Sequence, residues 1–113
     1  MATMATPLKD IQHQFRYELS GLPAVVASYC TVQFAPLRVR VWTLLDARHE
    51  DTERALAIAE RKLRDSFTMV TFDFNTTHLR DRDPVQFIPE GALNILARHS
   101  AVAEHFSRAV SAA

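Results

Sequence analysis

The sequence is short of cysteine and glycine and carries no net charge, and each of these shortages excludes a class of protein. Cys30 is the single cysteine among 113 residues, which excludes an intrachain disulfide and the usual cysteine-rich zinc sites. The two glycines exclude a glycine-rich loop that would cradle a phosphate. The 13 basic and 13 acidic side chains cancel, so the chain lacks the positive charge that accompanies binding to nucleic acids or anionic membranes.

Hydrophobic residues are plentiful but never form a long run. They make up 48% of the chain, which is typical of a compact globular domain. No apolar run approaches the roughly 20 residues of a transmembrane helix, and the N-terminus lacks the pattern of a secretory signal. The single cysteine suits a reducing compartment. We therefore expect a cytoplasmic protein without membrane contact, with a disordered N-terminus over residues 1–6 and a single α+β domain over residues 7–113.

The first third of the chain predicts a helix and then a strand. A helix-start signal at Thr6 and Pro7 and a stop at Gly21 indicate a helix over about residues 7–20. Its apolar side chains recur at helical spacing: Leu8, Ile11, Phe15, Leu19 and Leu22. Residues 24–34 are rich in β-forming side chains and should form a strand that pairs antiparallel with the following strand.

Residues 37–78 have the spacing of one strand–helix–strand unit. Period-two alternation predicts half-buried strands over residues 37–45 and 69–78. Their inward residues are Leu37, Val39, Val41 and Leu45 in the first strand and Val70, Phe72, Phe74, Thr76 and His78 in the second. Between the strands, Asp51 or Thr52 can cap a helix whose buried stripe consists of Leu56, Ala59, Leu63 and Phe67.

The C-terminal third is harder to interpret. The polar run over residues 80–84 predicts an exposed loop. Two alternatives remain open for residues 92–97, a short strand or the start of a longer helix. Ser100 is a good N-cap residue and favours a helix from residue 101.

The order helix, strand, strand, helix, strand and C-terminal helix predicts an α+β fold of the ferredoxin-like or split βαβ type, with the C-terminal helix packed on a small mixed sheet. A right-handed crossover would make the strands at 37–45 and 69–78 parallel, with the strand at 24–34 between or beside them. The two main helices would cover one face of the sheet and leave the other face open.

Three parts of the central unit carry a resemblance to known proteins. The strand around Val41-Trp42-Thr43, the helix with an acidic start and a basic end, and the strand around Phe72-Asp73-Phe74 resemble a group of small bacterial α+β proteins with no assigned activity. In element order alone, residues 7–78 are similar to the cytoplasmic domain of cation-diffusion-facilitator transporters. No transmembrane part precedes the domain here, and the metal ligands of that family have no matching residues. The resemblance implies an architecture and a tendency to dimerise, and nothing about activity.

The open sheet face is the best candidate for a functional surface. In the expected register it displays Tyr29, Arg38, Arg40, Trp42 and Asp73. Arginine with aromatic side chains is typical of a protein interface and also of proteins that stack on single-stranded nucleic acid. Neutral net charge favours the protein interface. Because aspartate is disfavoured within strands, we expect Asp73 to pair with Arg38 or Arg40 rather than to act as an acid or base. Alternatively, a C-terminal helix covers this face.

The turn over residues 46–51 is a second candidate, for a divalent metal. Asp46, His49 and Glu50 offer oxygen and nitrogen ligands there. The simpler interpretation is that Asp51 caps the following helix, Glu50 complements its dipole and His49 is solvated.

The sequence contains no glycine-framed serine or active-site cysteine motif, and Cys30 lies within an expected strand. We therefore predict a non-catalytic interaction or regulatory module without a cofactor. It would form a homodimer, or bind a protein partner, through the open sheet face. The alternatives are a divalent-metal-binding protein or metal-dependent enzyme that uses residues 46–51, and a protein that binds single-stranded nucleic acid.

Overall fold

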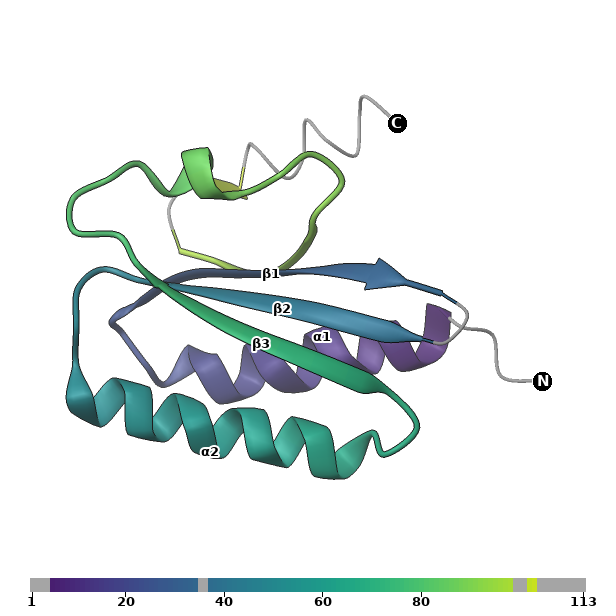
Figure 1. Ribbon diagram of the computed structural model, residues 1–113. Helices are drawn as coiled ribbons and strands as arrows, with labels where there is room; N and C mark the ends of the chain where they lie inside the picture. Colours follow the sequence, from purple (N-terminus) through teal and green to yellow (C-terminus); the bar gives the residue numbers. More distant parts are fainter. Residues whose placement is uncertain (1–4, 35–36, 99–101, 104–113) are drawn as a thin grey trace.

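In the computed structural model, which describes residues 5–34, 37–98 and 102–103, two α-helices lie on one face of a four-stranded mixed sheet (Figure 1). The elements are α1 (Ala5–Ser20), β1 (Val25–Gln33), β2 (Arg38–Leu45), α2 (Glu50–Ser66), β3 (Thr71–His78), the 3-10 helix η1 (Pro84–Phe87) and β4 (Leu93–Ala97). The segment that contains η1 passes over the opposite face of the sheet. The fold is therefore α+β, as the sequence predicts.

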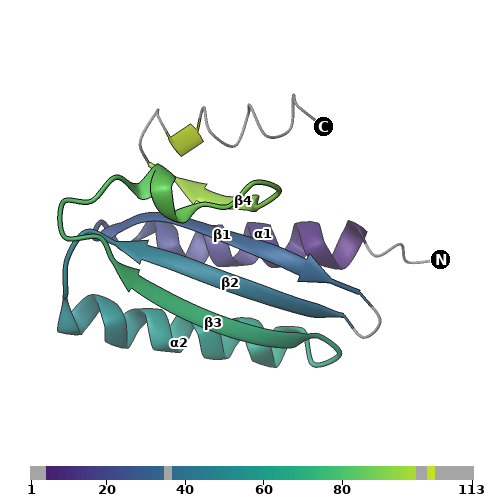
Figure 2. The same cartoon turned by 45° about the horizontal axis from the view of Figure 1, so that its top comes forward.

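The strands lie in the order β3-β2-β1-β4 (Figure 2). β1 pairs antiparallel with both β2 and β4, and β2 pairs parallel with β3. The predicted hairpin and the predicted parallel pair are confirmed. The ferredoxin-like arrangement is not confirmed, because β2 and β3 are hydrogen-bonded neighbours, whereas the two parallel strands of a split βαβ unit have another strand between them. β1 lies beside β2.

The ends of the elements differ from the predictions at three places. α1 begins at Ala5, inside the expected disordered N-terminus, of which residues 1–4 lie outside the described residues. The N-cap of α2 is His49, which makes no side-chain cap hydrogen bond, so the prediction of a cap at Asp51 or Thr52 is wrong. Residues 92–97 contain the strand β4. Of the helix expected from residue 101, Val102 and Ala103 have helical backbone and the remainder lies outside the described residues.

The core between the helices and the sheet follows the predicted apolar spacing. Its fully or almost fully buried members are Ile11, Phe15, Leu19, Val25, Cys30, Val39, Val41, Leu45, Leu56, Ala59, Leu63 and Ile95. Ile95 reaches this core through an irregularity in the β1–β4 pairing, where one residue of β4 is left without a partner and turns toward the helices. Each large aliphatic side chain in this layer contributes about 1.5–3 kcal/mol by leaving water.

β1 is buried on both faces, which distinguishes it from the other strands. All residues from Val25 to Cys30 are buried. The residues on the side away from the helices belong to a second core, made of Val26, Ala27, Tyr29, Leu44, Leu79, Ile88, Ala92 and Val102. The second core explains why the chain after β3 returns across the sheet, since this face of β1 is too apolar to remain in water.

A sharp turn after β3 directs the chain onto this face. Arg80 and Asp81 both have left-handed backbone, with φ of 51° and 69°. Neither residue is a glycine, so the turn needs support from its surroundings. The Arg82 side chain supplies it, because its Nε donates a hydrogen bond to the carbonyl of Leu79 (2.8 Å) and its Nη2 donates one to the carbonyl of His78.

Arg98 ties the end of β4 to the end of α1. Its Nε donates to the carbonyl of Val25 (2.7 Å), and its Nη2 lies 3.1 Å from each of the carbonyl oxygens of Leu19, Ser20 and Leu22. The last carbonyls of a helix have no partner within the helix, and they carry partial negative charge that a guanidinium neutralises. One side chain therefore closes α1, fixes the turn into β1 and holds the neighbouring edge strand.

We expect Arg98→Ala to lower the free energy of unfolding by about 1–2 kcal/mol, because charged hydrogen bonds to backbone carbonyls are lost at a partly exposed site. Urea denaturation followed by circular dichroism measures this change. Arg61→Ala, at an exposed position of α2, is the matched control and should change stability by less than about 0.5 kcal/mol. Equal effects of the two substitutions would show that Arg98 does not fasten α1 to β4.

Candidate interaction surface

The segment after β3 covers the second core as far as two stacked aromatic rings, those of Tyr29 and Trp42. Tyr29 and Trp42 lie face to face, with ring centroids 5.3 Å apart, and the Tyr29 hydroxyl donates a hydrogen bond to the carbonyl of Phe87. Tyr29 is only 3% exposed, and Trp42 is half-buried. The expectation that Tyr29 stands on an open face is therefore wrong, because the segment after β3 covers it. A buried, stacked Tyr29 also offers no free ring face to a nucleic-acid base.

Beyond Trp42 the sheet is open. The exposed residues there are Arg38 and Arg40 of β2 and Thr71 and Asp73 of β3, which we call the β2–β3 surface. Arg40 Nε lies 3.9 Å from Asp73 Oδ2, so the predicted ion pair is present. Both side chains are about half exposed, and such a pair stabilises a fold by only about 0–1 kcal/mol. Arg38 makes no ion pair or side-chain hydrogen bond within the described part of the chain.

The two edges of the sheet differ in their protection. The β4 edge is short and irregular, and two of its carbonyls accept hydrogen bonds from α1, one from Gln12 to Asn94 (2.8 Å) and one from Arg16 to Ile95 (2.5 Å). The β3 edge is eight residues long, pairs with β2 without any irregularity and contains no proline, glycine or lysine. Natural proteins use irregularities, short strands, proline and charged side chains, lysine above all, to prevent edge strands from pairing with other chains. Of these features the β3 edge has only one charged side chain in its middle, Asp73, whose carboxylate lies 3.9 Å from Arg40.

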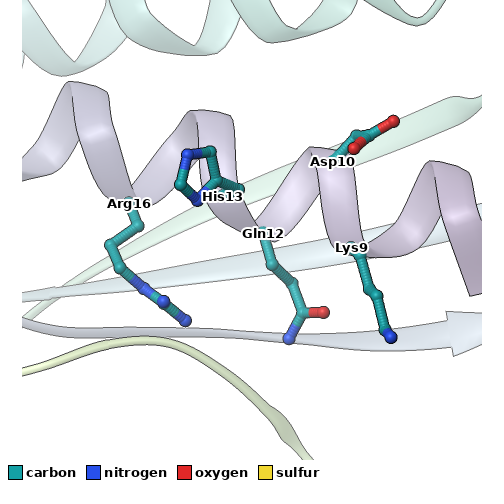
Figure 3. Close-up of a pocket in the computed structure, with 5 residues that line it drawn as sticks. All are labelled: Lys9, Asp10, Gln12, His13 and Arg16. Atoms are coloured by element: carbon teal, nitrogen blue, oxygen red, sulfur yellow. The ribbon is translucent and has the colours of Figure 1, made fainter.

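The β4 edge also explains a pocket on α1. This pocket has a volume of about 370 Å³ and is lined by Lys9, Asp10, Gln12, His13 and Arg16 (Figure 3). All five side chains come from a single helix, and two of them are already bonded to β4. The pocket is therefore the space beside a protected strand edge, and we assign it no function.

The predicted metal ligands are only partly brought together. His49 Nε2 lies 3.0 Å from Asp46 Oδ1, whereas Glu50 Oε1 accepts a hydrogen bond from Arg54 (3.2 Å). The Glu50–Arg54 pair is one that the i,i+4 spacing predicts. No group of three His, Cys, Asp or Glu side chains in the described ranges is arranged to hold a metal ion. The turn over residues 46–51 thus presents one histidine–carboxylate pair and not a set of three ligands.

A second histidine–carboxylate pair, which the spacing of residues along the sequence does not predict, lies at the same end of the sheet. His78 Nε2, at the end of β3, lies 3.0 Å from Glu53 Oε1 in the first turn of α2. When two parallel strands are joined by a helix, the end of the second strand lies beside the start of that helix. The predicted strand–helix–strand unit therefore places His78 near the first turn of α2. Both side chains are partly buried, so the pair joins the end of β3 to the start of α2.

Cys30 is also unavailable as a nucleophile. It is fully buried in the core between the helices and the sheet. Burial raises the pKa of its thiol from 9.0 to about 12, because the thiolate would lose its hydration. The thiol therefore stays protonated and unreactive at neutral pH.

No protein-family model, curated protein or solved structure matches the chain. Function is therefore inferred from the residues and their geometry. None of the helices within the described ranges is long and apolar enough to cross a membrane.

The raised pKa of Cys30 gives the stability of the fold a defined pH dependence. The unfolded thiol ionises near pH 9.0 and the folded one only near pH 12. Below pH 9.0 both states keep the proton and the thiol has no effect, whereas above it the unfolded state loses the proton first and folding becomes less favourable. We expect Cys30→Ala to make this alkaline loss of stability less steep. Urea unfolding on both sides of pH 9.0 measures the slope, and an unchanged slope in the variant would contradict the assignment.

Proposed function

We propose that the protein is a small, non-catalytic interaction module of the cytoplasm that binds a protein partner through the β2–β3 surface. The proposal rests on one observation: on the face away from the helices, the segment after β3 covers the sheet only as far as Trp42. The helices and the segment after β3 bury both faces of β1, yet Arg38 and Arg40 of β2 and Asp73 of the regular edge strand β3 remain exposed.

The chemistry of this surface supports a protein partner. Arginine is enriched in protein interfaces because its guanidinium forms forked hydrogen bonds and stacks on flat groups. Arg38 has no partner among the described residues, and Arg40 shares only a long, exposed contact with Asp73. Both can turn to a carboxylate or carbonyl of a partner at little cost. A free, buried cysteine is compatible with a reducing compartment.

The test is charge reversal on the β2–β3 surface. We expect Arg38→Glu with Arg40→Glu to release bound protein while stability changes by less than about 1 kcal/mol, because both side chains are exposed. Affinity capture from the cells that produce the protein, with identification by mass spectrometry, detects other proteins. Sedimentation of the purified chain detects copies of itself.

Arg48→Glu with Arg61→Glu is the matched control, since both arginines are exposed and lie away from the β2–β3 surface. The control should retain what the wild-type chain binds. The proposal fails if the wild-type chain neither captures a protein nor associates with itself, or if the two double variants behave alike.

A further inference from the structure

We propose that the occupant of the β3 edge is a second copy of this chain, which pairs antiparallel with β3 around Phe74 and joins two four-stranded sheets into one. This inference rests on the proposed function and names its partner.

The backbone of β3 has a defined set of free groups. The N–H groups of Thr71 and Leu79 donate to β2 and to its last residue, at 3.2 Å from Leu37 O and 2.8 Å from Leu45 O. Backbone groups alternate sides along a strand, so odd-numbered residues of β3 face β2. The N–H and C=O groups of Phe72, Phe74 and Thr76 therefore face outward, and β3 has no second neighbour in the sheet.

An antiparallel pair centred on Phe74 uses all of these groups. Phe74 faces Phe74 of the second copy, and Phe72 faces Thr76, so that each facing pair exchanges both backbone hydrogen bonds. The side chains remain on the same faces as before, and α2 of each copy lies on the same side of the joined sheet. Phe72 and Phe74, which stack on each other at 5.4 Å and are only partly buried, come to lie beside Thr76 and Phe74 of the second copy, respectively.

Asp73 limits the possible registers. Pairing centred on Asp73 itself would place two carboxylates directly opposite each other, which is unfavourable. Centring on Phe74 instead places Asp73 opposite Asn75, whose amide can donate a hydrogen bond to the carboxylate. Arg40 on the neighbouring strand lies 3.9 Å from the same carboxylate and offsets part of its charge. The chain as a whole has no net charge, so two copies do not repel each other at long range.

Thr76→Pro tests the pairing directly. Proline removes the outward-facing N–H of this residue, which makes no hydrogen bond within the sheet of one copy, and edge strands tolerate proline at such positions. In sedimentation equilibrium of the full chain, the wild type should be a dimer. Thr76→Pro should weaken the dimer by roughly tenfold or more, while circular dichroism stays unchanged. Thr76→Val keeps the N–H and is the control that should remain dimeric.

Asn75→Asp provides a second test that leaves the backbone intact. By symmetry it places two new carboxylates opposite Asp73, one for each copy, and should raise the dissociation constant of the dimer roughly fivefold at low salt. Asn75→Gln is its uncharged control. A wild-type chain that is monomeric at all concentrations overturns the inference, as does a dimer that neither Thr76→Pro nor Asn75→Asp weakens.

Cysteine cross-linking determines which residues of the two β3 strands face each other. Facing residues that do not exchange backbone hydrogen bonds have Cα atoms about 4.5 Å apart, which a disulfide can span. Thr71→Cys combined with Thr77→Cys, which face each other in this register and leave Asp73 in place, should therefore cross-link two copies on oxidation, and neither single variant should. Cross-linking by a single variant overturns the register centred on Phe74. A monomeric chain that captures another protein through Arg38 and Arg40 overturns this inference and leaves the proposed function standing.

Discussion

The burial of β1 on both faces is the constraint on which the rest of the structure depends. Six consecutive residues, from Val25 to Cys30, are withdrawn from water. Val25 and Cys30 belong to the core beneath the helices, whereas Val26, Ala27 and Tyr29 belong to the second core, with an irregularity in the β1–β2 pairing between Val25 and Ala27. A strand of this kind needs a layer on each side, since every exposed aliphatic side chain would forfeit about 1.5–3 kcal/mol. The helices supply one layer. The chain after β3 supplies the other, which is why it turns sharply at Arg80 and Asp81 instead of continuing away from the sheet.

The second layer is smaller than the first, and this difference shapes the exposed surface. α1 and α2 together span the sheet, whereas the segment over the other face holds its residues Leu79, Ile88 and Ala92 against β1 and the adjoining end of β2. Trp42 lies at its border, with one ring face against Tyr29. The polar start of β2 and the first half of β3 remain exposed on this face, and the charged residues Arg38, Arg40 and Asp73 are found there. The exposed surface is thus a consequence of where the apolar residues of β1 end.

The sequence predicted the elements well and their assembly less well. Amphipathic spacing located α2, β2 and β3 because each has one apolar side, and the spacing of a buried side depends only on local geometry. β1 differs, since Val25, Val26 and Ala27 are apolar in succession. A continuous apolar run of this kind is typical of a strand that is covered on both faces, and on that basis Tyr29 is expected to be buried. The contacts of Arg98 and of His78 with Glu53 join residues distant in sequence, and no periodicity encodes them.

Asp73 bears both on the stability of the sheet and on the pairing that we propose for its edge. A carboxylate in the middle of a strand is unfavourable, and at an edge it normally serves to keep other chains away. Here its charge is opposed by Arg40 on the adjacent strand, and the backbone around it is regular. In the pairing that we propose, an aspartate whose charge is partly offset disfavours chiefly those registers that bring another carboxylate opposite it. It would then select the register of pairing more than it would prevent pairing.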